Sequence, residues 1–190
     1  MQEIDIAVLL YEAQEGDKDA FALLQDEYEA AIQRFVRRMM KNPDDVDDIV
    51  QRTFIALYMN LDRIDPPEKL RPFLFRVARN LCYDNLRKYY RRDEMALQDC
   101  EHRLETEHLS PEDTAHWNLM LEQVRKAIDC LPEIHRDTLI FYVEEGLSQA
   151  EIADIMETEV GTVKSRLFYA RKLLKQTVSP DILQALQHSK

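Results

Sequence analysis

The sequence predicts an all-α protein made of two small helical domains joined by an acidic linker. The chain has only 3 glycines and 7 prolines in 190 residues. Long runs between them repeat apolar residues at three- and four-residue steps, the spacing of an amphipathic helix. Residues 93–116 are strongly acidic and have little apolar periodicity. We therefore expect domains at residues 1–92 and 117–178, a linker at 93–116 and a C-terminal tail at 179–190.

The composition limits how such a chain could bind a partner. Its formal net charge is −11, and 45% of its residues are hydrophobic. An acidic protein does not bind nucleic acid through its overall field, so any such binding must come from local basic patches. The chain has no long apolar run, and its N-terminus lacks the basic start of a signal peptide. We expect a cytoplasmic protein without membrane insertion.

Nothing in the sequence indicates a metal, a cofactor or a catalytic site. The three cysteines, Cys82, Cys100 and Cys130, are odd in number and widely spaced. Both features disfavour a disulfide framework and a zinc site built from cysteines. Cys82 and Cys130 lie in apolar patterns and are expected to be core thiols. Cys100 lies near three histidines, but the spacing fits no compact ligand set. Without a glycine-rich phosphate loop or a nucleophile–base pair, an enzyme is disfavoured.

The N-terminal domain is expected to contain four helices. Gly16 ends the first, and Asp17 is a plausible N-cap for the second. Asn42 and Pro43 end the second helix, and a loop with two prolines precedes the fourth. The helices are expected at residues 4–15, 18–41, 44–61 and 70–92.

The third predicted helix begins with a cluster of carboxylates at positions 44, 45, 47 and 48. Acidic residues in a first turn complement the helix dipole, which is one explanation of the cluster. The other is an acidic docking face for a basic partner, continued along the helix by Gln51.

The fourth predicted helix, Leu70–Arg92, is a basic segment in an acidic chain. It holds seven arginines and lysines against the single Asp84. One side of it is an expected core stripe: Phe73, Leu74, Val77, Ala78, Leu81 and Leu86. The other side interleaves rings, cations and an amide: Phe75, Arg76, Arg79, Asn80, Tyr83, Arg87, Tyr90 and Arg91. Cations bind phosphates, and rings stack on unpaired bases with about 1–3 kcal/mol per base. The alternative is a solvated basic face whose tyrosines cap a core.

The C-terminal domain is predicted to hold a helix-turn-helix. Helices are expected at 117–131 and 133–145, with Gly146 as a C-cap. Ser148 and Glu151 form a capping box, a turn follows at 157–161, and Thr162 begins a second helix. Away from its core positions this helix presents Lys164, Ser165, Arg166, Phe168, Tyr169, Arg171 and Lys172. Recognition helices place such residues in the major groove. The alternative is a helical hairpin with a basic solvent face.

Four strings in this order resemble bacterial RNA polymerase sigma factors of the extracytoplasmic-function (ECF) type. They are GDKDAFALLQDEY, DDVDDIVQRTFIALYMNL, LRPFLFRVARNLCYDNLR and LPEIHRDTLIFYVEEGLSQAEIADIMETEVGTVKSRLFYARKLL. The resemblance implies a promoter-melting domain (region two), a linker, and a domain that reads the minus-35 element (region four). It implies a non-catalytic factor that binds core RNA polymerase, directs it to specific promoters and assists DNA melting.

The resemblance also assigns roles to individual residues. Core polymerase would bind through the clamp helices of its largest subunit and through its flap, the former at Asp47, Asp48, Gln51 and Phe54. The minus-10 element would meet Ile64, Phe75, Arg76, Arg79, Asn80, Tyr83, Arg87, Lys88 and Arg91. In this set Asn80 would contact a flipped base, and the loop at 61–70 would complete its pocket. The minus-35 element would meet Thr162, Lys164, Ser165, Arg166, Phe168, Tyr169, Arg171 and Lys172.

Two positions depart from the family pattern. Ile64 stands where an aromatic ring often lies, which weakens stacking on a captured base. Tyr169 stands where arginine is often found, so a bidentate contact to guanine, with about 1–3 kcal/mol of discrimination, is missing there.

The sequence leaves open alternative interpretations of the linker, of the binding partners and of the class of protein. The linker could imitate a nucleic-acid backbone in a polymerase channel, or be a solvated spacer. An anti-sigma factor is a further candidate partner. A stand-alone helix-turn-helix regulator and a helical protein-interaction adaptor are the alternatives to a sigma factor.

Overall fold

The computed structural model describes residues 5–40, 42–92 and 122–177, and within these ranges the regular structure is entirely helical. This confirms the predicted all-α class. The chain divides into two compact units, Met1–Met95 with Ala150–Glu157, and Ala96–Gln149 with Thr158–Lys190. The predicted linker and C-terminal tail lie outside the described residues.

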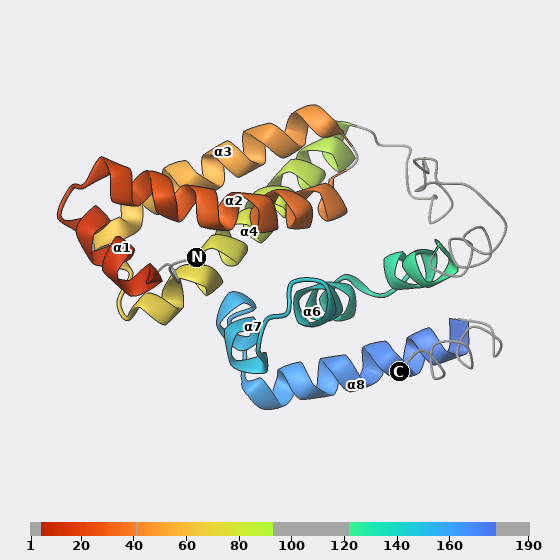
Figure 1. Ribbon diagram of the computed structural model, residues 1–190. Helices are drawn as coiled ribbons and strands as arrows, with labels where there is room; N and C mark the ends of the chain where they lie inside the picture. The colour runs from red at the N-terminus through yellow and green to blue at the C-terminus, as the bar shows by residue number, and fades with distance from the viewer. Residues whose placement is uncertain (1–4, 41, 93–121, 178–190) are drawn as a thin grey trace, which may run out of the picture. The chain divides into compact units, whose positions relative to one another are not determined.

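The N-terminal residues of the first unit form the four helices that the sequence predicts there. They are α1 (Ile6–Gln14), α2 (Lys18–Met39), α3 (Pro43–Asn60) and α4 (Leu70–Arg92), with short 3₁₀ turns η1 (Leu61–Arg63) and η2 (Pro67–Lys69) between the last two. Figure 1 shows α2, α3 and α4 as long neighbouring helices, and the three pack on one another in pairs. α1 packs on α2 and contacts both 3₁₀ turns. The predicted bounds differ from these by no more than two residues.

Side-chain caps fix where α2 and α3 begin. The Asp17 carboxylate accepts hydrogen bonds from the amides of Asp19 at 2.8 Å and Ala20 at 3.1 Å, which confirms the predicted N-cap of α2. Asn42 caps α3 in the same way, through the amide of Asp44 at 3.2 Å. Each cap satisfies amides that have no partner inside the helix, and such a cap stabilises a helix by about 1 kcal/mol.

The core of this unit joins side chains from all four helices. Phe35 of α2 and Phe75 of α4 are both fully buried, and their rings meet edge to face with centroids 5.6 Å apart. An aromatic pair in this geometry contributes about 0.5–1.5 kcal/mol beyond its buried area. Other fully buried side chains around them are Leu10, Leu24, Ile32, Ile49, Leu57, Leu70 and Leu74.

The C-terminal part begins with helical residues at 122–129. It continues with α6 (Glu133–Val143), α7 (Gln149–Ile155) and α8 (Val160–Thr177). α8 begins two residues before the predicted Thr162, because the amides of Thr162 and Val163 already donate to the Glu159 carbonyl at 2.9 and 3.2 Å. Just after α6, Gly146 takes a left-handed φ of 63°, a conformation that favours glycine.

α6 and α8 pack against each other through a small apolar core (Figure 1). Its buried members include Ile140, Phe141, Val163, Leu167 and Ala170. Cys130 is exposed, so its prediction as a core thiol is wrong, whereas Cys82 is buried as expected. Cys130 follows the helical residues 122–129 in a turn, where the local apolar pattern no longer reports on burial.

Across the described residues, 5–40, 42–92 and 122–177, no helix combines the length and apolar character needed to cross a bilayer. Nor do histidine, cysteine and carboxylate side chains in those ranges form a group of three or more that could hold a metal ion.

The buried aromatic contact gives a direct test of this core. Replacing Phe75 by alanine should lower the free energy of unfolding by about 3–5 kcal/mol, because a fully buried ring is lost and a cavity remains. A matched change on the surface of the same unit is Met59→Ala, at a side chain that is 76% exposed. It should alter the free energy by no more than about 0.5 kcal/mol.

Urea unfolding followed by circular dichroism measures both variants. Equal effects of the two substitutions would show that Phe75 is not a core residue.

Candidate nucleic-acid and polymerase interfaces

The two sides of α4 differ sharply in burial. Leu70, Leu74, Phe75, Ala78 and Cys82 are buried and form its core side. Phe73, Val77, Leu81 and Leu86, which the sequence places in the core stripe, are only half-buried. The predicted stripe is therefore rotated relative to the observed one, and the placement of Phe75 on the basic side is wrong.

The helical period explains this error. At 3.6 residues per turn Phe75 and Arg79 lie only about 40° apart around the axis, so a local pattern groups them together. In the structure Phe75 points into the core, and Arg79 is a half-buried residue at the rim. A long arginine side chain can start near the core and still carry its charge to water. The partner that buries Phe75 belongs to α2, which no local pattern of α4 reveals.

The remaining predicted residues form what we call the α4 basic face: Arg76, Arg79, Asn80, Tyr83, Arg87 and Lys88. The Arg79 guanidinium carbon lies 4.7 Å from the centre of the Tyr83 ring, within cation–π distance. Asn80 is exposed beside this pair. Arg87 donates to Asp84 at 3.0 Å, a pair exposed enough to be weak. Arg91 lies in α4, but its side chain is outside the described residues.

The loop before α4 is held by a residue that the sequence analysis missed. The Gln14 side-chain amide of α1 donates to the carbonyls of Leu61 at 2.9 Å and Ile64 at 3.0 Å. Gln14 lies one turn after the buried Leu10, and a polar residue on the inner side of a short helix is the signal that could have identified it. The loop is therefore tied to α1 through its backbone.

Ile64 itself is only 3% exposed. Its prediction as a surface residue of a base pocket is wrong, because the aliphatic side chain turns into the core of the unit. A hollow of about 530 Å³ does open nearby, lined among others by Gln14, Phe21 and Tyr58, but Asn80 is not part of it.

The start of α3 carries the predicted acidic face. Asp47, Asp48 and Gln51 are exposed, and Asp48 pairs with Arg52 at 3.3 Å. Phe54 is only 4% exposed, so its prediction as part of an exposed docking face is wrong.

The cluster of aspartates is also not uniform. Asp45 is half-buried and accepts a hydrogen bond from Asn85 of α4 at 3.2 Å. Asp45 thus links α3 to α4, and the outward acidic face is carried by its neighbours at positions 44, 47 and 48.

α8 holds the second basic surface. It contains five lysines and arginines and no carboxylate. Phe168 is 63% exposed and Tyr169 51% exposed, and Lys164, Ser165, Arg171 and Lys172 are exposed too. Thr162 and Arg166 are half-buried. The Ser165 hydroxyl donates to the Gly161 carbonyl at 3.1 Å, so its proton is used within the helix and its lone pairs face outward.

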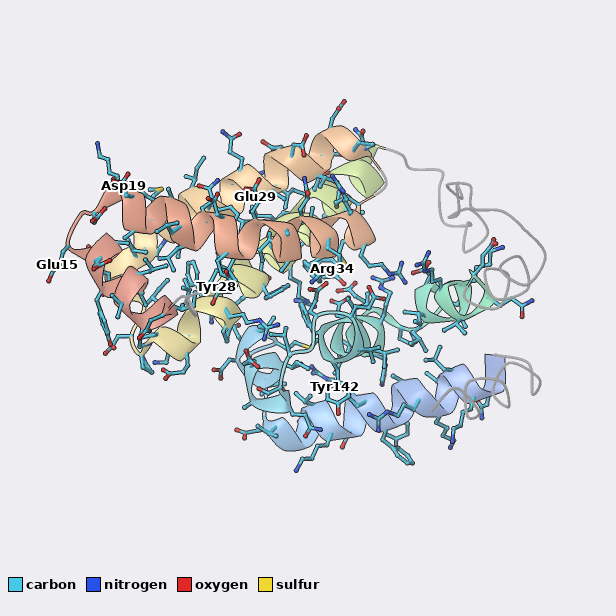
Figure 2. The ribbon with its side chains drawn as sticks, in the orientation of Figure 1. Glu15, Asp19, Tyr28, Glu29, Arg34 and Tyr142 are labelled. Carbon is cyan, nitrogen blue, oxygen red and sulfur yellow. The ribbon has the colours of Figure 1, made fainter. Side chains whose placement is uncertain are left out.

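Two side chains of α6 that the sequence analysis did not identify reach this surface. Tyr142 lies on the side of α6 toward α8 (Figure 2), and the Arg171 guanidinium carbon lies 5.6 Å from the centre of its ring. His135 meets Tyr169 edge to face at 6.3 Å. The two α6 residues are seven apart, which places them on one side of a helix. That spacing shows that the two residues share a side of α6, but it does not predict that this side packs on α8.

One titratable group away from these surfaces has a shifted pKa. Burial raises the pKa of the Tyr28 phenol on α2, although the Arg71 guanidinium opposes part of the rise. Because the folded-state pKa lies above the unfolded value of about 10, the resulting stabilisation is complete below that pH and is lost as the pH rises further. The phenol is neutral at physiological pH and takes no part in the two basic surfaces.

Comparison with known proteins assigns each half of the chain to a class. Residues 24–92 match the family model described as Sigma-70 region 2, and residues 121–174 match Sigma-70, region 4. These two regions define an RNA polymerase sigma factor.

Full-length relatives give the family within that class. The chain is 31% identical to the ECF RNA polymerase sigma factor SigW of Bacillus subtilis, over 92% of this chain and 97% of that protein. It is 33% identical to the ECF RNA polymerase sigma-E factor of Escherichia coli K12, over 95% and 98%. The chain belongs to the ECF RNA polymerase sigma factors, and it directs RNA polymerase to promoters.

Solved structures share the fold. CnrH, solved in complex with the cytosolic domain of CnrY, matches with a TM-score of 0.68 and 26% identity over 90% of this chain and 96% of that one. The sigma factor RpoE from Bartonella quintana, solved in complex with the anti-sigma factor NepR, matches with a TM-score of 0.64 and 24% identity over 92% and 100%.

The anchoring of the loop by Gln14 can be tested by stability. Gln14→Ala should lower the free energy of unfolding by about 1–3 kcal/mol, because two backbone carbonyls lose their donor. Glu12→Ala, at an exposed position of the same helix, should have almost no effect. If urea unfolding gave the same midpoint for Gln14→Ala and Glu12→Ala, the proposed anchor would be refuted.

Proposed function

We propose that this sigma factor opens promoter DNA with its α4 basic face and reads the minus-35 element with α8. The observation that carries the proposal is the arrangement on α4. An exposed amide, Asn80, stands beside a tyrosine ring that is covered by a guanidinium, on a helix whose opposite side is buried. This combination of groups suits a single-stranded segment with unstacked bases.

Strand opening requires that the cost of unstacking be offset. Taking a base out of the duplex costs a few kcal/mol. Stacking on an aromatic ring returns about 1–3 kcal/mol per base, and an arginine beside the ring adds a cation–π contribution. The Tyr83 ring together with the Arg79 guanidinium over it can provide both. Asn80 can donate and accept hydrogen bonds at a base edge. Arg76, Arg87 and Lys88 can bind the phosphates of the same strand.

Because Phe75 and Ile64 are buried, fewer side chains can contact a base than the sequence predicted. Neither side chain is available to a base, since both are no more than 3% exposed. Phe75 instead packs α4 on α2, and the backbone carbonyl of Ile64 accepts a hydrogen bond from the Gln14 side-chain amide.

The acidic face of α3 is proposed to bind core RNA polymerase. Asp47, Asp48 and Gln51 are exposed and lie within two turns of one helix, so they can meet a basic partner surface together. The buried Phe54 would support this helix from inside and make no contact itself. The flap of the polymerase is a second proposed contact, made by the C-terminal part.

The minus-35 element is proposed to meet the exposed residues of α8. Lys164, Arg171 and Lys172 can neutralise phosphates, and each such contact contributes to a steep salt dependence of binding. Phe168 and Tyr169 can contact base edges by apolar surface and, for Tyr169, by one hydroxyl. A tyrosine cannot form the bidentate contact to guanine that arginine makes.

The chain is proposed to act in the cytoplasm without catalysis of its own, because core polymerase supplies the nucleotide chemistry. The proposed domains are residues 1–92 and 117–178. An anti-sigma factor is a proposed partner, by analogy with the complexes of CnrH and RpoE.

Promoter opening should depend on the centre of the α4 basic face. Arg79→Ala and Asn80→Ala should each lower the yield of open complex about 5-fold or more, since one lost contact of this kind costs about 1–3 kcal/mol. Binding to core polymerase should stay unchanged. Permanganate footprinting of the transcription bubble measures opening, and a bubble of normal size and yield in either variant would contradict the assignment.

Polymerase binding should depend on α3. The double change Asp48→Ala with Gln51→Ala should weaken co-purification with core polymerase, because an exposed charge and an amide are lost from the proposed contact. A control is the single change Glu29→Ala, which removes an exposed carboxylate from α2, outside the proposed contact (Figure 2). Wild-type affinity of the double variant would exclude this face.

Transcription of genomic fragments by core polymerase with and without the protein tests the whole proposal. The expected result is a set of new start sites that share upstream elements. A stand-alone regulator would instead shift DNA tightly in a gel without polymerase and produce no new start sites.

A further inference from the structure

The recognition surface of α8 receives a side chain from outside the helix. His135 lies in the first turn of α6 and is half-buried. Its ring meets the ring of Tyr169 with centroids 6.3 Å apart and planes at 80°. This is the edge-to-face geometry in which the positive edge of one ring meets the negative face of the other.

Tyr169 is touched by a second ring as well. Phe168, its neighbour in the chain, meets it at 5.6 Å with an interplanar angle of 79°. Two perpendicular contacts restrict the rotation of the Tyr169 side chain to fewer rotamers than an isolated exposed tyrosine would have. Tyr169 is nevertheless 51% exposed, so part of its side chain is open to a ligand.

The histidine has no other evident use in the part of the chain that the structure describes. Its Nδ1 atom is buried there without a hydrogen-bond partner. Among those same residues, His135 belongs to no group of three or more histidine, cysteine and carboxylate side chains that could hold a metal ion. The ring contact with Tyr169 is thus the interaction that the structure gives to the His135 side chain.

We propose that His135 is a positioning residue for Tyr169, and that the pair sets the base preference of α8 in the minus-35 element. The proposal rests on the proposed function of α8. A phenol offers one hydroxyl that donates or accepts, together with an apolar ring that suits a thymine methyl group. Such a group discriminates between bases only if its direction is fixed, and His135 fixes it from α6.

The alternative is that the contact only helps α6 to pack on α8. In that case the loss of His135 would lower binding to every promoter sequence by the same factor, or lower stability alone. Positioning predicts a different result, namely that the ratio of affinities between promoter sequences changes.

The test uses holoenzyme assembled from the full chain and core polymerase. Promoter fragments taken from the mapped start sites carry single base-pair substitutions through the minus-35 element, and the affinity for each fragment is measured. The variants are H135A, H135F, Y169A and the double variant H135A with Y169A. Circular dichroism and urea midpoints confirm that each variant is folded.

We expect H135A to change the affinity ratio at one or two base pairs by about 2- to 10-fold, the range that corresponds to one aromatic pair. H135F, which keeps a ring at that position, should restore the wild-type ratio. The double variant should show the same base preference as Y169A alone, because His135 acts through Tyr169.

Two results would overturn the proposal. One is an H135A variant that keeps the wild-type affinity ratios, and the other is a double variant whose effects are the product of the single ones. If α8 does not contact the minus-35 element at all, the result is different. The affinity of wild-type holoenzyme would then be the same for every minus-35 substitution, and K164A would leave promoter affinity unchanged. That outcome would overturn both proposals together.

Discussion

The edge-to-face contact between Phe35 and Phe75 fixes the rotation of α4, and the proposed function depends on that rotation. With Phe75 in the core, 3.6 residues per turn place Asn80 about 140° away around the helix axis, which is the solvent side. Arg79 and Tyr83 then lie at the rim between core and solvent, where both are half-buried and close enough for a cation–π contact. A different buried residue would turn another set of side chains outward.

The same principle operates in α8. Val163, Leu167 and Ala170 are buried on one side, and their burial turns the cations and rings of the other side outward. Here α6 adds side chains of its own, since Tyr142 and His135 each contact a residue of the exposed set. In both units a small apolar core thus determines which polar groups can meet DNA, and a chain of net charge −11 carries two local basic surfaces.

Much of this could be predicted from the sequence because it depends on local physical chemistry. The Asp17 cap, the extent of α4 and the charge asymmetry of α8 follow from residues within a few positions of each other. Phe75, Ile64 and Phe54 were misplaced because their burial is decided by partners elsewhere in the chain. The roles of Gln14 and His135 depend on contacts across 47 to 50 and 34 residues, which no local pattern contains.

Site-specific photocrosslinking from α4 tests the central claim most directly. A photoreactive residue at position 80, in holoenzyme bound to an open promoter, should crosslink to the non-template strand of the minus-10 element. The same residue at position 59, which is exposed on α3, should not crosslink to that strand. Equal crosslinking from the two positions, or none from position 80 in a complex that transcribes normally, would contradict the account.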